Sequence, residues 1–162
     1  MQDKQLTKNA EFADVSTLSA NGRLIAIDPG TKRIGVAVCD ELRVTTRALP
    51  VIDRKSWKNL LLKIKNLLAE FDAVGLVVGL PYNFDGAETD MTADAIHMAR
   101  KFALSIDVPV FLQDERATSY EAKGRLWQQG ADLQTTRRFV DSEAAAIILA
   151  DFLDRIVREP TA

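Results

Sequence analysis

The sequence has little of several residue types, and each shortage narrows the chemistry open to it. It contains one cysteine, Cys39, so no disulfide can form within the chain. It contains one histidine, His97, which excludes a zinc site or mechanism that needs two histidines. No stretch reaches the roughly 18 uninterrupted apolar residues that a membrane-spanning helix requires, so we expect no membrane partner.

The chain also lacks a strong net charge. Lys and Arg number 21 against 23 Asp and Glu, which gives a formal charge of -2 at pH 7. That balance argues against a protein that coats nucleic acid through bulk positive charge, but it allows a local basic patch beside an acidic pocket. The 162 residues are enough for one compact domain with a sizeable core and too few for two.

Residues 1–22 contain no apolar segment of the kind found in secretory signals, and their acidic residues outnumber their basic ones. Their small polar composition predicts a flexible N-terminal tail. Residues 23–158 contain no internal repeat or low-complexity linker, so we expect them to form a single domain. The absence of a targeting signal favours a cytoplasmic protein.

Hydrophobic periodicity predicts three strands first, then an alternation of helices and strands. The first two strands are expected to form a hairpin around the turn Asp-Pro-Gly-Thr-Lys-Arg at residues 28–33. The predicted strands are 24–27, 34–39, 43–51, 74–80 and 109–112. The predicted helices are 54–71, 91–102, 118–129 and 141–157.

This order predicts an α/β fold with a mixed five-stranded sheet. The first three strands would form an antiparallel meander, the later strands would be parallel, and helices would flank both faces. Among small α/β domains, this is the order expected of an RNase H-like fold.

Three acidic residues stand where elements end or begin: Asp28 after the first strand, Glu115 after the last strand, and Asp141 at the predicted start of the final helix. Side chains at the carboxyl ends of strands converge on one crevice in such sheets. Each acid also has a structural alternative. Asp28 can start a turn, Glu115 can be a solvated loop charge, and Asp141 can cap a helix.

Carboxylates brought together repel one another unless a cation lies between them. Mg²⁺ and Mn²⁺ favour oxygen ligands, and two such ions can activate water for phosphodiester hydrolysis. We therefore expect Asp28, Glu115 and Asp141 to be the catalytic and metal-binding residues of a Mg²⁺- or Mn²⁺-dependent enzyme.

Basic residues gather near the predicted acids. Residues 116–138 hold five bases against two acids, within a chain whose net charge is -2. Arg and Lys at the rim of a metal site can hold phosphates, although a solvated helix face is the usual explanation for such a stretch. Tyr82 and Phe84, after the strand 74–80, can stack on an unpaired base or pack under their loop. Asp85 can be a fourth acid of the site or form an Asx turn before Gly86, and the turn is favoured. The candidate nucleic-acid contacts are Lys32, Arg33, Arg116, Lys123, Arg125, Arg137, Arg138, Tyr82 and Asn83.

Four segments, in order, resemble the motifs of the bacterial YqgF/RuvX family. The segments are Ile25-Ala-Ile-Asp-Pro-Gly-Thr-Lys-Arg-Ile-Gly-Val-Ala-Val38, Val77-Val-Gly-Leu-Pro-Tyr-Asn-Phe-Asp-Gly86, Asp114-Glu-Arg-Ala-Thr-Ser-Tyr-Glu-Ala122 and Val140-Asp-Ser-Glu-Ala-Ala-Ala-Ile-Ile-Leu149. The resemblance covers about residues 23–155. It implies an RNase H-like fold, and the family's proposed catalytic acids align with Asp28, Glu115 and Asp141.

The resemblance also implies an activity, a metal-dependent nuclease that processes the 5′ end of pre-16S rRNA. The principal alternative is a Holliday junction resolvase, whose paired cuts need a two-fold dimer, so the protein is expected to be a monomer or a homodimer acting on RNA or on branched DNA. Two alternatives of another class are a non-catalytic RNA-docking domain and a nucleotide-binding domain. The latter is suggested by the likeness of Asp28-Pro-Gly-Thr31 to the phosphate-binding hairpin of sugar kinases.

Overall fold

The computed structural model describes residues 12–83, 85–115 and 133–158, and in the last of these ranges it describes side chains for residues 142–157. The helix predicted over 118–129 falls outside these ranges, as do Arg116, Lys123 and Arg125. Within the described ranges, no helix is long and apolar enough to cross a membrane.

Five strands form one sheet in the order β3-β2-β1-β4-β5. β1 pairs antiparallel with β2, and β2 pairs antiparallel with β3. β4 lies between β1 and β5 and is parallel to both. The predicted meander followed by parallel strands is therefore confirmed. The strands are β1 Leu24–Pro29, β2 Arg33–Cys39, β3 Thr46–Asp53, β4 Gly75–Leu80 and β5 Val110–Asp114.

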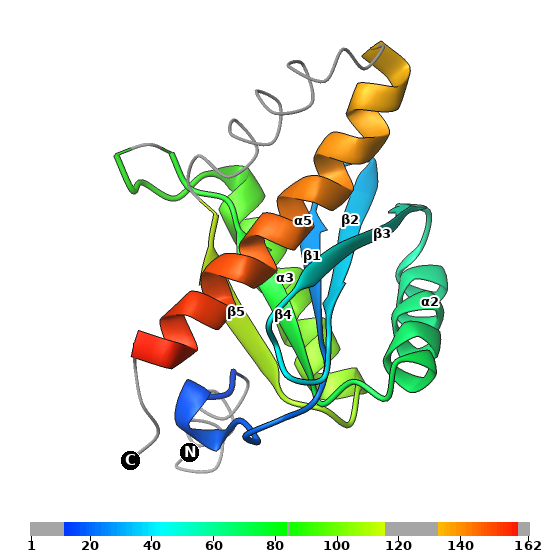
Figure 1. Cartoon of the computed structure of the whole chain (residues 1–162). Helices are drawn as coiled ribbons and strands as arrows, with labels where there is room; N and C mark the ends of the chain where they lie inside the picture. The colour runs from blue at the N-terminus through cyan, green and yellow to red at the C-terminus, as the bar shows by residue number, and fades with distance from the viewer. Residues whose placement is uncertain (1–11, 84, 116–132, 159–162) are drawn as a thin grey trace.

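Helices cover both faces of the sheet, as predicted. Figure 1 shows α2 (Trp57–Glu70) and α3 (Asp90–Ser105) on one face, while α5 (Leu133–Arg158) crosses the other. Alternate residues of β1 divide between two cores. Ile25 and Ile27 pack with α2 and α3, whereas Leu24 and Ala26 pack with α5.

Local sequence explains where two of these helices begin. The Ser56 hydroxyl accepts a hydrogen bond from the Asn59 N–H at 3.1 Å and caps α2. Thr89 and Thr92 form a reciprocal capping box at the start of α3. The buried residues of α2 and α3 recur mostly at steps of three and four and form one buried stripe on each helix. They are Leu60, Ile64 and Leu68 on α2, and the polar Thr92 followed by Ala95, Met98, Ala99 and Phe102 on α3.

α5 begins at Leu133, well before the predicted start at Asp141, so the interpretation of Asp141 as an N-cap is wrong. Figure 1 shows the first turns of α5 extending beyond the sheet. α5 reaches the core by Ser142, whose hydroxyl donates a hydrogen bond to the Leu49 carbonyl oxygen at 2.6 Å. The buried apolar residues that the structure describes on α5 start at Ala144 and Ala145.

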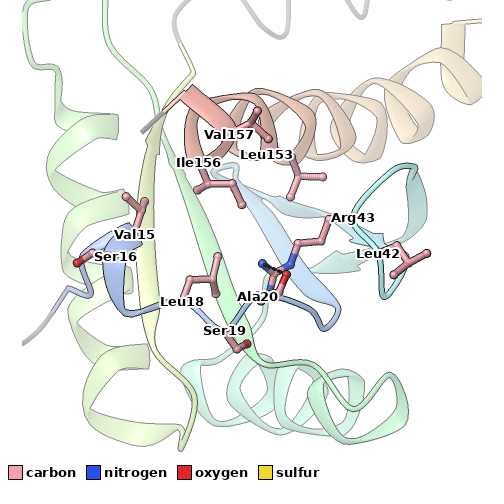
Figure 2. Close-up of a pocket in the computed structure, with 10 residues that line it drawn as sticks. All are labelled: Val15, Ser16, Leu18, Ser19, Ala20, Leu42, Arg43, Leu153, Ile156 and Val157. Carbon is pink, nitrogen blue, oxygen red and sulfur yellow. Dashed lines mark hydrogen bonds between the residues drawn. The ribbon is translucent and has the colours of Figure 1, made fainter. Parts of the chain in front are cut away.

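Residues 12–22, part of the predicted tail, pack against the sheet near the amino end of β1. The Ala13 N–H donates a hydrogen bond to the Val110 carbonyl oxygen at 2.8 Å, and a short 3₁₀ helix, η1 (Val15–Thr17), follows. A mainly apolar pocket of about 540 Å³ lies beside this segment. Figure 2 shows Val15 and Leu18 on one side of it and Ile156 of α5 on the other. This pocket lies away from the carboxyl ends of the parallel strands.

Candidate active site

Asp28 lies near the carboxyl end of β1, on the sheet face that α5 covers. Ile27 packs on the opposite face, so strand alternation places Asp28 on the α5 side. After Pro29 the chain reverses, and the Gly30 N–H donates a hydrogen bond to the Arg33 carbonyl oxygen at 3.0 Å. A Cβ on residue 30 would stand 2.3 Å from that oxygen, so the turn after Asp28 requires glycine.

Glu115 follows β5 and is fastened to the end of β4. Its backbone N–H donates a hydrogen bond to the Leu80 carbonyl oxygen at 3.0 Å, and the residue is only 8% exposed. The carboxyl group of Glu115 is hydrogen-bonded to the side chain of Asp28. The structure thus brings together two of the three predicted acids, although β4 lies between their strands.

Gly79 of β4 makes room for this contact. A Cβ at position 79 would lie 3.0 Å from Glu115 Oε2 and 2.6 Å from Ile148 Cδ1 of α5. The Glu115 carboxyl group and α5 therefore pack directly against the backbone of β4. Gly79 was not among the predicted site residues, although a lone glycine inside a buried strand is a signal of close approach.

Burial and the neighbouring carboxyl group favour a protonated Glu115, whose proton the pair would share. Burial raises the pKa of Glu115 to about 10, with further contributions from the charge of Asp28, the hydrogen bond to Asp28 and the charge of Asp114. Glu115 Oε2 is buried and has no hydrogen-bond partner among the described residues. A hard divalent cation favours such oxygens and would replace the shared proton, so this pair fits Mg²⁺ or Mn²⁺.

Asp141, the third predicted ligand, lies inside α5, and its side chain is outside the described set. It precedes Ile148 by two helical turns, or about 10 Å along the helix axis. Ile148 is the residue of α5 that contacts the Gly79 position. Among the side chains that the structure does describe, no group of three His, Cys, Asp or Glu is placed to hold a metal ion.

Two of the predicted phosphate contacts flank this acidic pair. Lys32 is exposed and Arg33 half-buried, and both lie in or beside the β1–β2 turn that follows Asp28. Arg137 and Arg138 lie in the first turns of α5, where only the backbone is described.

Hydrogen bonds from Arg54, which the sequence analysis missed, hold the β1–β2 turn in place. The backbone N–H of Arg54 donates a hydrogen bond to the Lys32 carbonyl oxygen, and its side-chain Nη1 donates one to the Gly30 carbonyl oxygen, each at 2.9 Å. The Arg54 guanidinium also donates to both carboxylate oxygens of Asp94 on α3, at 2.8 and 3.0 Å. No local pattern marks this set, because its members come from three separate parts of the chain.

The loop after β4 carries the predicted base contacts. Tyr82 is half-buried and forms an isolated β-bridge with Glu88, and Asn83 is exposed. Asp85 Oδ1 accepts a hydrogen bond from the Ala87 N–H at 2.9 Å, so the favoured Asx turn is confirmed. The Thr92 hydroxyl donates to the Pro81 carbonyl oxygen and ties this loop to α3.

The fold is similar to that of a solved RNase H-like resolvase. The structure titled "T. thermophilus RuvC in complex with Holliday junction substrate" matches with a TM-score of 0.50 and 18% sequence identity, over 87% of this chain and 98% of that one. At that identity the likeness establishes the fold, and the predicted RNase H-like architecture is confirmed.

Sequence comparison gives closer relatives, each named "Putative pre-16S rRNA nuclease". The protein from Syntrophus aciditrophicus (strain SB) is 38% identical over 85% of this chain and 91% of its own. The protein from Citrobacter koseri is 38% identical over 83% of this chain and 98% of its own. The sequence model of the family described as "RuvX: Holliday junction resolvase" matches residues 22–155. Because that match spans most of the chain and carries the Asp28 and Glu115 segments, this protein belongs to the RuvX family.

Proposed function

We propose that this protein is a metal-dependent endonuclease that processes the 5′ end of pre-16S rRNA in the cytoplasm. The observation that carries the proposal is the hydrogen-bonded carboxyl pair Asp28–Glu115 at the carboxyl ends of its strands. A buried carboxyl group beside a second carboxyl group has no structural benefit by itself, because burial of a carboxylate without a counter-charge is unfavourable. The names of the relatives support RNA as the substrate.

In this proposal Asp28, Glu115 and Asp141 hold Mg²⁺ or Mn²⁺. When bound, such ions supply Lewis-acid activation of water and stabilise charge on the leaving oxygen. The protein's own part is to keep the Asp28 and Glu115 oxygens close together and Glu115 sheltered from water. It must also release the proton that the pair shares.

The basic residues around the pair would grip the substrate. Lys32 and Arg33 stand on a turn fixed by Arg54, so the backbone that carries their charges is held just after Asp28. They and Arg116 would hold the phosphates that flank the scissile bond. Tyr82 and Asn83 would contact an unpaired base. The remaining proposed backbone contacts are Lys123, Arg125, Arg137 and Arg138.

A Holliday junction resolvase is the second candidate, favoured by the description of the family model. A resolvase makes two symmetric cuts, so it must work as a two-fold dimer. The pre-16S rRNA nuclease can work as a monomer or a homodimer. Native mass spectrometry together with junction cleavage separates the two, because a strictly monomeric protein that leaves junctions intact is not a resolvase.

The decisive assay compares three substrates with Mn²⁺ present: a structured precursor RNA with the 16S 5′ leader, an unstructured RNA of equal length, and a four-way DNA junction. We expect cleavage of the precursor RNA, with loss of activity in Asp28→Asn. The matched control is Asp107→Asn, the same chemical change at an exposed residue just before β5.

Full activity in Asp28→Asn would refute the assignment of the site. Tight RNA binding with no cleavage under any metal would identify a non-catalytic docking domain instead. Binding of ATP by the isolated protein would favour the nucleotide-binding alternative.

A further inference from the structure

A small basic pocket lies between α2 and α3, on the sheet face opposite α5. Its volume is about 110 Å³, well below the roughly 300–1,000 Å³ of pockets that enclose drug-sized ligands. Three basic side chains and one carboxylate line it. These residues are Arg54, Lys55, Lys101 and Asp94.

The one carboxylate in this pocket is already neutralised. Both oxygens of Asp94 accept hydrogen bonds from the Arg54 guanidinium, and those bonds lower the pKa of Asp94. The nearby charges of His97 and Lys101 lower it further. The ammonium groups of Lys55 and Lys101 therefore give the pocket a positive surplus that this carboxylate does not cancel.

The Lys101 ammonium is held in place by an aromatic ring. Its Nζ lies 4.3 Å from the centroid of Trp57, and Trp57 in turn packs edge-on against Phe102 with their centroids 4.7 Å apart. The Trp57 face that could stack on a base is thus covered by the lysine. The pocket therefore offers positive charge but no exposed aromatic ring on which a base could stack. Such a pocket favours binding of an anionic group, such as a phosphate, whatever the nucleotide sequence.

Arg54 links the pocket to the β1–β2 turn that follows Asp28. The same guanidinium that lines the pocket donates to the Gly30 carbonyl oxygen, two residues after Asp28. The backbone N–H of Arg54 donates to the Lys32 carbonyl oxygen. The exposed Lys32 therefore lies on a turn that borders both the acidic pair and the basic pocket.

We propose that this pocket binds one backbone phosphate of the RNA substrate, outside the scissile bond, through Lys55 and Lys101. The inference rests on the proposed function, because it extends the same substrate path across the β1–β2 turn to the α2–α3 face. The role of this phosphate contact is to raise the affinity for RNA and to fix the direction in which the strand leaves the active site, independent of its sequence. Arg54 shapes the pocket and is a positioning residue for the turn.

The test uses a fluorescein-labelled single-stranded RNA 20-mer and the full chain with Mn²⁺, with RNA integrity checked on a gel after each titration. Anisotropy gives Kd at several KCl concentrations for wild type and for Lys55→Gln/Lys101→Gln. The matched control is Lys63→Gln/Lys65→Gln, which removes the same charge from exposed positions of α2. Thermal melting verifies that both double variants fold.

We expect the pocket variant to bind several-fold more weakly, and its slope of log Kd against log [KCl] to fall by about 0.7, the value for one phosphate of a single strand. The control variant should match wild type. An equal slope in the two variants would overturn the inference, as would complete displacement of the 20-mer by stoichiometric inorganic phosphate.

Cleavage of the precursor RNA is measured in parallel. The pocket variant should have a raised KM and an unchanged kcat, because Lys55 and Lys101 do not touch the reacting atoms. A wild-type protein that cuts no substrate but shows the slope difference would refute the proposed function and retain the pocket. A protein that cuts RNA without the slope difference would retain the function and refute the pocket.

Discussion

The carboxyl group of Glu115 is hydrogen-bonded to Asp28 across an intervening strand, with Gly79 of that strand beneath the contact. Glu115 is buried and cannot easily carry a second negative charge beside Asp28. The pair is therefore a destabilising element of the metal-free protein and a site that a divalent cation would relieve.

The stability of the metal-free protein should fall as pH rises. The pKa of Glu115 is raised in the folded state to about 10, so between its ordinary value and that one the folded protein binds more protons than the unfolded chain. Stability then decreases with pH, by at most about 1.4 kcal/mol per pH unit for one proton. Thermal melts in EDTA from pH 5 to 9 measure it. Glu115→Gln should flatten the profile, and an unchanged profile would contradict the assignment.

Metal should reverse this loss. At pH 8, Mg²⁺ or Mn²⁺ at a hundred times its Kd would stabilise the protein by about 2.7 kcal/mol. For a chain of this size that corresponds to a rise in Tm of roughly 5–10 °C. Asp28→Asn and Glu115→Gln should show little of this rise, while Asp107→Asn should show all of it. Equal rises in all four proteins would place the metal elsewhere.

Gly79→Ala should lower the stability of the protein and its activity, each through a different contact. Its Cβ would clash with Ile148 Cδ1 and crowd Glu115 Oε2, and overpacking of this kind costs about 1–3 kcal/mol. Ile148→Val removes the clashing Cδ1, so Gly79→Ala/Ile148→Val should recover stability in urea denaturation. Metal binding and cleavage should remain impaired in the double variant because the crowding of Glu115 persists. Recovery of activity together with stability would mean that Gly79 serves packing alone.

Arg54→Ala should loosen the turn that follows Asp28. Its ion pair with Asp94 is partly exposed and contributes little by itself. Loss of the hydrogen bond to Gly30 should cost about 0.5–1.5 kcal/mol. Hydrogen exchange of the peptide covering residues 29–33 should speed up, with a fall in kcat/KM for RNA. Asp94→Asn, which leaves the Gly30 contact in place, should have the smaller effect on both.

Local patterns were sufficient for most of the fold. The apolar run ending at Leu80 indicates a strand buried on both faces, and the helical spacing of Leu60, Ile64 and Leu68 indicates a helix on a sheet. Such patterns depend on neighbours along the chain, which is why they can be read without coordinates. The start of α5 could not be predicted in this way, because residues 134–138 are all polar and give no apolar period.

The sequence by itself determined that acids stand at the ends of strands and that bases lie near them. Only the tertiary structure decided that Glu115 meets Asp28, because this depends on the strand order β1-β4-β5 and on the missing side chain at Gly79. It likewise decided that Arg54, Asp94 and the β1–β2 turn form one unit. Contacts between distant residues depend on register and packing, and no local pattern encodes them.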